Sequence, residues 1–118
     1  MAEKSGQILI IDDDQEVLLS AEMVLEEYFR RVHTLSHPAG LNEFLKQENE
    51  DIDVVLLDMN FTRGSSDGQE GLDWLERISR LAPHISIVLI TAYGDIELAV
   101  RAMKKGAFDF VLKPWKNA

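Results

Sequence analysis

The sequence predicts an open α/β fold, a five-stranded parallel sheet of strand order 2-1-3-4-5 with helices on both faces. Short apolar runs rich in Val, Ile and Leu predict strands that are buried on both faces. These runs alternate strictly with segments whose apolar residues recur at helical spacing, which implies parallel strands joined by right-handed crossovers. Polar side chains follow most of the strands, and the carboxyl ends of the strands form the edge at which such sheets bind ligands.

The first two strands flank the first helix. Residues 7–11 are predicted to form a buried strand that runs into three aspartates, of which Asp14 suits the N-cap of the following helix. The apolar stripe of this helix comprises Val17, Leu18, Ala21, Val24, Leu25 and Tyr28. Residues 31–35 have the pattern of a short second strand.

The middle of the chain holds the third strand. Pro38 is predicted to open a second helix at its first turn, and the polar connection 47–53 follows that helix. Residues 54–57 are four apolar residues that run directly into Asp58. The third helix is marked by Leu72, Leu75 and Ile78.

Two further strands and one helix complete the predicted sheet. Residues 85–90 form an apolar strand that leads to Thr91. The next helix is marked by Ile96, Val100 and Met103. Gly106 suits the C-cap of that helix, because glycine adopts the left-handed conformation without strain. Residues 108–112 form the last strand and lead into Lys113.

Composition limits the classes of function. The 118 residues suffice for one domain, and the absence of cysteine excludes disulfides and thiolate metal sites. A net charge of −9 argues against direct binding to nucleic acid, which requires a basic surface. No apolar run is long enough to span a membrane or to serve as a signal peptide, so we expect a cytoplasmic location and no membrane partner.

The residues that follow the strands predict a phosphoryl site. The carboxyl ends of parallel strands share one edge, so Asp12, Asp13, Asp58, Thr91 and Lys113 should gather there. Three carboxylates at one edge repel each other unless a cation is bound, and magnesium is a hard ion that prefers such oxygen ligands. A lysine and a hydroxyl beside a metal-bound carboxylate suit a phosphoryl group, since aspartate is a known phosphoryl acceptor.

These motifs together resemble the receiver domain of bacterial two-component response regulators, a flavodoxin-like fold. The matching segments are 8–14, 54–58, 89–94 and 106–114. Within them, Thr-Ala-Tyr-Gly-Asp and Gly-Ala-Phe-Asp-Phe further resemble receivers of enhancer-binding transcription activators. The resemblance implies that Asp58 is the phosphoacceptor, that Asp13 binds Mg²⁺ directly and Asp12 mainly through water, and that the backbone carbonyl of Asn60 is a further ligand.

The resemblance also assigns a switch. Thr91 would form a hydrogen bond with the phosphoryl group, and Lys113 would form an ion pair with it. Phe110 takes the position of the switch aromatic, which is often Tyr in this family. The implied partners are a sensor histidine kinase and an output domain beyond residue 118, with a homodimer as an option. We therefore expect residues 1–118 to be a single domain and a fragment of a longer regulator, with only weak self-phosphorylation and autodephosphorylation as enzyme activity.

Two departures from the family pattern leave alternatives open. The loop 60–68 is longer than usual and lacks the usual Pro, so a degenerate receiver that acts as a constitutive interaction module is one alternative. A magnesium phosphohydrolase is another, although Asn60 cannot serve as its acid–base residue. The family's fifth helix would follow Trp115, so we expect it to be truncated and part of one sheet face to be exposed. Taken singly, the aspartates could be capping residues, Thr91 a turn residue and Lys113 a solvated lysine.

Overall fold

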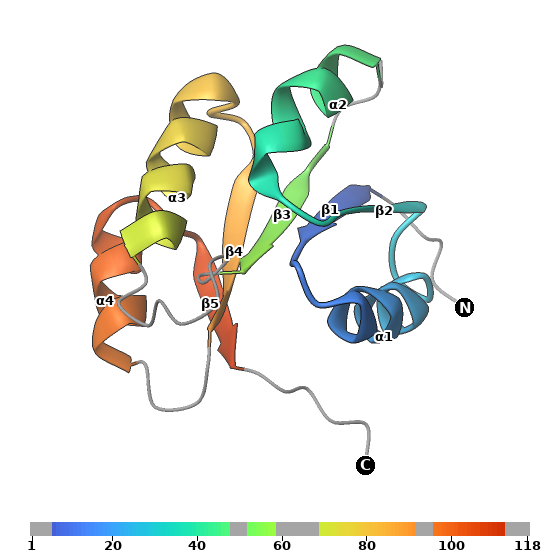
Figure 1. The fold of residues 1–118 in the computed structure, drawn as a ribbon, viewed down its shortest axis with the longest axis horizontal. Helices are drawn as coiled ribbons and strands as arrows, with labels where there is room; N and C mark the ends of the chain where they lie inside the picture. Colours follow the sequence, from blue (N-terminus) through green and yellow to red (C-terminus); the bar gives the residue numbers. More distant parts are fainter. Residues whose placement is uncertain (1–5, 48–51, 59–68, 92–95, 113–118) are drawn as a thin grey trace.

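The computed structural model describes residues 6–47, 52–58, 69–91 and 96–112 (Figure 1). The strands are β1 (Gln7–Ile11), β2 (Arg31–Leu35), β3 (Val54–Asp58), β4 (Ser86–Thr91) and β5 (Asp109–Leu112). The helices are α1 (Gln15–Leu25), the 3-10 turn η1 (Pro38–Gly40), α2 (Leu41–Gln47), α3 (Gln69–Leu81) and α4 (Ile96–Lys104). All strand pairs are parallel, and the order β2-β1-β3-β4-β5 confirms the predicted fold class.

Helices cover the two faces of the sheet unequally. The ribbon shows α2, α3 and α4 on one side of the sheet and α1 on the other (Figure 1). Along β1, Leu9 and Ile11 belong to the larger apolar cluster under α2, α3 and α4, whereas Ile8 and Ile10 belong to the smaller cluster under α1. This alternation follows from the two-residue period of a strand. All five β1 residues are buried, which explains why the four that follow Gln7 are continuously apolar.

The register brings the ends of the central strands together. Ile11 and Leu57 are partners across β1 and β3, so the residues that follow them, Asp12 and Asp58, lie at the same edge. On its other side Asp58 is the partner of Ile90 in β4. The topological switch between β1 and β3 therefore carries the acidic residues, as the strand order requires.

Local side-chain chemistry fixes where the helices begin and end. Asp14 caps α1 as predicted, since its Oδ1 accepts hydrogen bonds from the backbone N–H groups of Glu16 at 2.9 Å and Val17 at 3.4 Å. Gly106 follows α4 with φ +113°, a backbone conformation that side chains rarely adopt. The predicted glycine C-cap is therefore confirmed.

Several predicted boundaries were wrong by a few residues. α1 ends at Leu25, and Tyr28 lies in the following turn with 67% of its surface exposed. The turn changes the helical phase, so Phe29 instead packs against the smaller cluster. Pro38 opens η1 rather than α2 itself, because the first turn is a 3-10 helix. β4 also extends to include Thr91, while β5 begins at Asp109 rather than at residue 108.

The α1 face of the sheet is only partly covered in the described part of the chain. A groove of about 350 Å³ lies beside α1, and its walls include the half-buried strand residues Val54, Val88 and Val111. These residues belong to β3, β4 and β5, and their partial exposure agrees with the predicted exposure of part of one sheet face. None of the helices within the described ranges has both the length and the apolar character needed to cross a lipid bilayer.

Candidate functional site

Asp12 is placed by the turn between β1 and α1. Its backbone N–H donates to the carbonyl of Leu35 at 3.1 Å, which extends the β1–β2 pairing by one residue. Its Oδ1 accepts from the backbone N–H of Asp14 at 2.9 Å. The Asp12 side chain is completely buried, whereas Asp13 is exposed. One short sequence thus supplies a buried carboxylate, an exposed carboxylate and a helix cap.

Asp58 is the last residue of β3, and only 2% of its surface is exposed. Carboxylate oxygens of Asp12, Asp13 and Asp58 all lie within 4.8 Å of one another. We call these three residues the acidic cluster. Sequence reasoning placed them at one edge of the sheet, and the structure brings them together there.

Electrostatic repulsion within the acidic cluster favours the binding of a cation. Two unit charges 4.8 Å apart repel by about 3 kcal/mol at an effective dielectric constant of about 20. Burial of Asp12 and Asp58 prevents water from screening this repulsion well. The donor set consists of carboxylate oxygens, which are the ligands that Mg²⁺ prefers, and so the residues fit that ion.

The other predicted site residues are described only in part by the structure. Thr91 ends β4 and is the register partner of Leu112, but its side chain is outside the description. Asn60 and Lys113 also lie outside the described residues. Phe110 in β5 is the partner of Leu89, two residues before Thr91, and its half-buried ring packs against the larger apolar cluster.

Sequence reasoning assigned no role to the residues around Trp74. The structure shows the indole in contact with two basic side chains. The Arg77 guanidinium lies 4.8 Å from the centroid of the Trp74 ring, and the His37 ring meets it edge-on with centroids 6.0 Å apart. The spacing of Trp74 and Arg77 by three residues on a helix could have indicated the first contact. The second joins separate elements and has no local sequence pattern.

Comparison with known proteins identifies what the chain is similar to. The sequence model of the response regulator receiver domain family matches residues 8–118. The phosphoglycerate transport system transcriptional regulatory protein PgtA of Salmonella typhimurium is 38% identical over 107 residues, which are 91% of this chain and 24% of that protein. The chain therefore spans about a quarter of the length of this relative.

Solved structures agree with the sequence comparison. The N-terminal signal receiver domain of a two-component system response regulator from Bacteroides fragilis is 48% identical, with a TM-score of 0.81 and coverage of 97% of this chain and 88% of that one. A response regulator receiver domain protein from Clostridium thermocellum is 32% identical, with a TM-score of 0.77. The match covers 94% of this chain and 84% of that one.

Proposed function

The chain belongs to the response regulator receiver domain family, and on this premise we propose that it is a signalling switch in which Asp58 accepts a phosphoryl group from a sensor histidine kinase. The observation that carries the proposal is the acidic cluster, in which a buried carboxylate at the end of β3 lies within 4.8 Å of two others. Such a cluster can bind a divalent cation, and the cation can in turn neutralise the charge on the oxygens of a phosphoryl group.

The chemistry requires one bond to form and one to break. An Asp58 carboxylate oxygen attacks the phosphorus of a phosphohistidine, a P–O bond forms, and the P–N bond to the imidazole breaks. The electron pair of that bond returns to the departing imidazole nitrogen, and an acyl phosphate remains on Asp58. Mg²⁺ held by Asp12, Asp13, Asp58 and the carbonyl of Asn60 would supply positive charge to the phosphoryl oxygens.

The neighbouring strands supply the remaining roles. β4 ends at Thr91 beside the strand that carries Asp58, so its hydroxyl is our candidate donor to the phosphoryl group. Lys113 directly follows β5 and would pair with the same group. Phe110 would report the state of the site to partners, because it lies two residues from the register partner of Thr91 in a half-buried position.

The output of the switch lies in a larger protein. PgtA is named as a transcriptional regulatory protein, and the chain covers 24% of it. We therefore propose that residues 1–118 form the receiver domain of a longer cytoplasmic transcription regulator of the enhancer-binding type. Phosphorylation would change its contacts with the output domain or with a second copy of the chain. Its enzyme activity would be limited to self-phosphorylation from phosphodonors and autodephosphorylation.

Treatment with acetyl phosphate and MgCl₂ followed by intact-mass spectrometry tests the proposal. Wild type should gain one phosphoryl group, and Asp58→Asn should gain none because an amide is not a nucleophile for phosphorus. Absence of any adduct on wild type would favour the constitutive interaction module, and continuous release of phosphate over many turnovers would favour a phosphohydrolase. Equal labelling of Asp58→Asn would refute the assignment of Asp58.

A further inference from the structure

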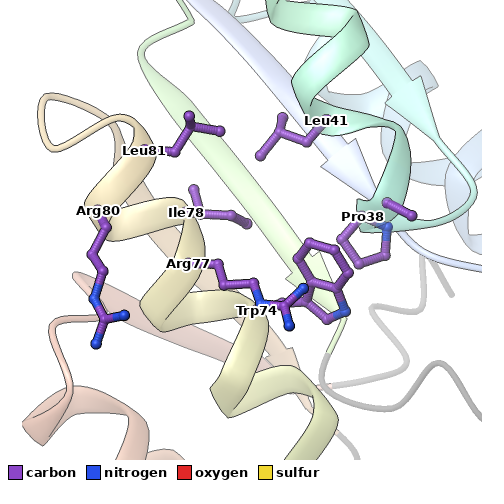
Figure 2. Close-up of a pocket in the computed structure, with 8 residues that line it drawn as sticks. Pro38, Leu41, Trp74, Arg77, Ile78, Arg80 and Leu81 are labelled. Atoms are coloured by element: carbon purple, nitrogen blue, oxygen red, sulfur yellow. The ribbon is translucent and has the colours of Figure 1, made fainter.

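A second concave surface lies away from the acidic cluster, between α2 and α3. This α2–α3 groove has a volume of about 420 Å³ and is lined from η1 and α2 by Pro38, Ala39 and Leu41. The opposite wall is α3, and Figure 2 shows Trp74, Ile78 and Leu81 directed toward η1 and α2, whereas the Arg80 side chain extends away from them at the edge of the groove. Its residues are Trp74, Arg77, Ile78, Arg80 and Leu81. None of the lining residues belongs to the acidic cluster.

The floor of the α2–α3 groove is apolar and already ordered. Leu41 and Ile78 are fixed in the larger cluster, with 2% and 1% of their surfaces exposed. The half-buried Trp74 ring is held between the His37 ring and the Arg77 guanidinium. His37 is itself fixed, since its Nδ1 accepts from the backbone N–H of Ala39 at 3.0 Å. Because these side chains are already ordered, binding of a ligand would cost little further conformational entropy in the floor of the groove.

The rim of the groove combines exposed apolar surface with positive charge. Leu81 has 50% of its surface exposed, and Arg77 and Arg80 are both exposed at one turn's spacing on α3. Within the part of the chain that the structure describes, the lining residues include two arginines and no carboxylate, although the whole chain carries a net charge of −9. Arg80 lies 3.8 Å from Glu76 in an exposed pair, and such pairs are weak enough to exchange for an incoming carboxylate.

We propose that the α2–α3 groove is the docking site for an acidic peptide segment of a partner protein. One large apolar side chain of the peptide would pack against Trp74 and Leu81, and flanking Asp or Glu residues would pair with Arg77 and Arg80. Tryptophan and arginine are, with tyrosine, the residue types enriched among the contacts that dominate binding energy. The volume suits a side chain and its neighbours, since ligand sites measure roughly 300–1,000 Å³.

Charge complementarity selects this occupant over others. Nucleic acid would meet the negative field of the rest of the chain, whereas a short acidic segment can be confined to the arginine-lined groove. A purely apolar ligand would leave the Arg77 guanidinium, which lies against the Trp74 ring, and the Arg80 side chain at the edge of the groove without an ionic partner from the ligand. The acidic peptide satisfies both the apolar floor and the cationic rim.

Selection from a display library of random peptides tests the proposal. Wild type should enrich peptides in which Asp or Glu flanks Leu, Phe, Met or Trp, and synthetic copies should bind less tightly as salt concentration rises. The double variant Arg77→Glu/Arg80→Glu should lose about tenfold or more in affinity, since the two attractive charges become repulsive. Arg30→Glu/Lys104→Glu is the matched control, because it makes the same change in net charge at exposed positions outside the groove lining.

A fluorescence readout places the peptide on the molecule. The chain has two tryptophans, so Trp115→Phe leaves Trp74 as the single reporter. Binding of a selected peptide should shift the Trp74 emission, and circular dichroism checks that each variant is folded. Enrichment of peptides without acidic residues, equal affinity for both double variants, or an unchanged Trp74 emission would overturn the proposal. Self-association of wild type that Arg77→Glu/Arg80→Glu abolishes would instead identify a second copy of the chain as the occupant.

Discussion

Replacing Asp12 by Asn should stabilise the metal-free protein. Asn has nearly the same shape, and its side-chain oxygen can still accept from the Asp14 N–H that now lies 2.9 Å from Asp12 Oδ1. The substitution removes the negative charge of Asp12, whose carboxylate lies within 4.8 Å of two others. Each such pair costs about 3 kcal/mol at an effective dielectric constant of about 20, and relaxation and water reduce this. We expect the free energy of unfolding without Mg²⁺ to rise by about 1–2 kcal/mol.

Urea unfolding with EDTA and with MgCl₂ measures this effect. Wild type should gain stability with Mg²⁺, because the ion binds the folded state alone, and Asp12→Asn should gain much less. Asp109→Asn is the matched control, since it removes one exposed carboxylate while its side-chain oxygen still accepts from the Phe110 N–H. If Asp12→Asn is no more stable than wild type in EDTA, or gains equally from Mg²⁺, our account of charge repulsion in the acidic cluster is wrong.

Four further predictions follow from the same structure. Asp13→Ala should weaken Mg²⁺ binding by about tenfold or more in calorimetry because it removes a charged ligand, and equal affinity would contradict the metal site. A hydrogen bond from Lys105 holds the Glu76 pKa below its ordinary value of 4.5, so the ionised pair stabilises the fold above that value and its contribution disappears as pH falls through the lower folded pKa. Lys105→Met should therefore raise the Glu76 pKa in an NMR titration; an unchanged pKa would refute the pairing. Phosphorylation should move the Phe110 ring inward as Thr91 approaches the phosphoryl group, and a crystal structure of each state with the same outward rotamer would exclude this switch. A chain extended by about one helix should melt at a higher temperature than residues 1–118, whereas identical, concentration-independent melting would show that the α1 face of the sheet is already covered.

The sheet could be predicted from the sequence because its strands are buried on both faces. Burial of both faces leaves a short apolar run rich in Ile or Val in β1 after Gln7 and in most of β3, and this length and composition favour a strand over a helix. Strand order then placed Asp12 and Asp58 at one edge, since the register of parallel strands determines which ends meet. The acidic cluster was thus predictable before any distance was known.

Features that depend on packing between elements were harder to predict. Tyr28 fits the helical period of α1, but the chain leaves the helix at Leu25 and turns Phe29 toward the sheet. The α2–α3 groove is lined by residues of separate elements, and the contact between His37 and Trp74 likewise joins two elements that are distant in sequence. Periodicity reports which face of one element is apolar, and it does not report how two elements meet.

Chemical mapping of the phosphorylated residue tests the central claim most directly. After treatment with acetyl phosphate and MgCl₂, borohydride reduces an acyl phosphate to an alcohol, and peptide mass spectrometry locates the reduced residue. We predict that the reduced residue is Asp58, the buried carboxylate at the end of β3. Reduction at Asp12 or Asp13 instead, or no reduced residue despite phosphoryl uptake, would contradict the account.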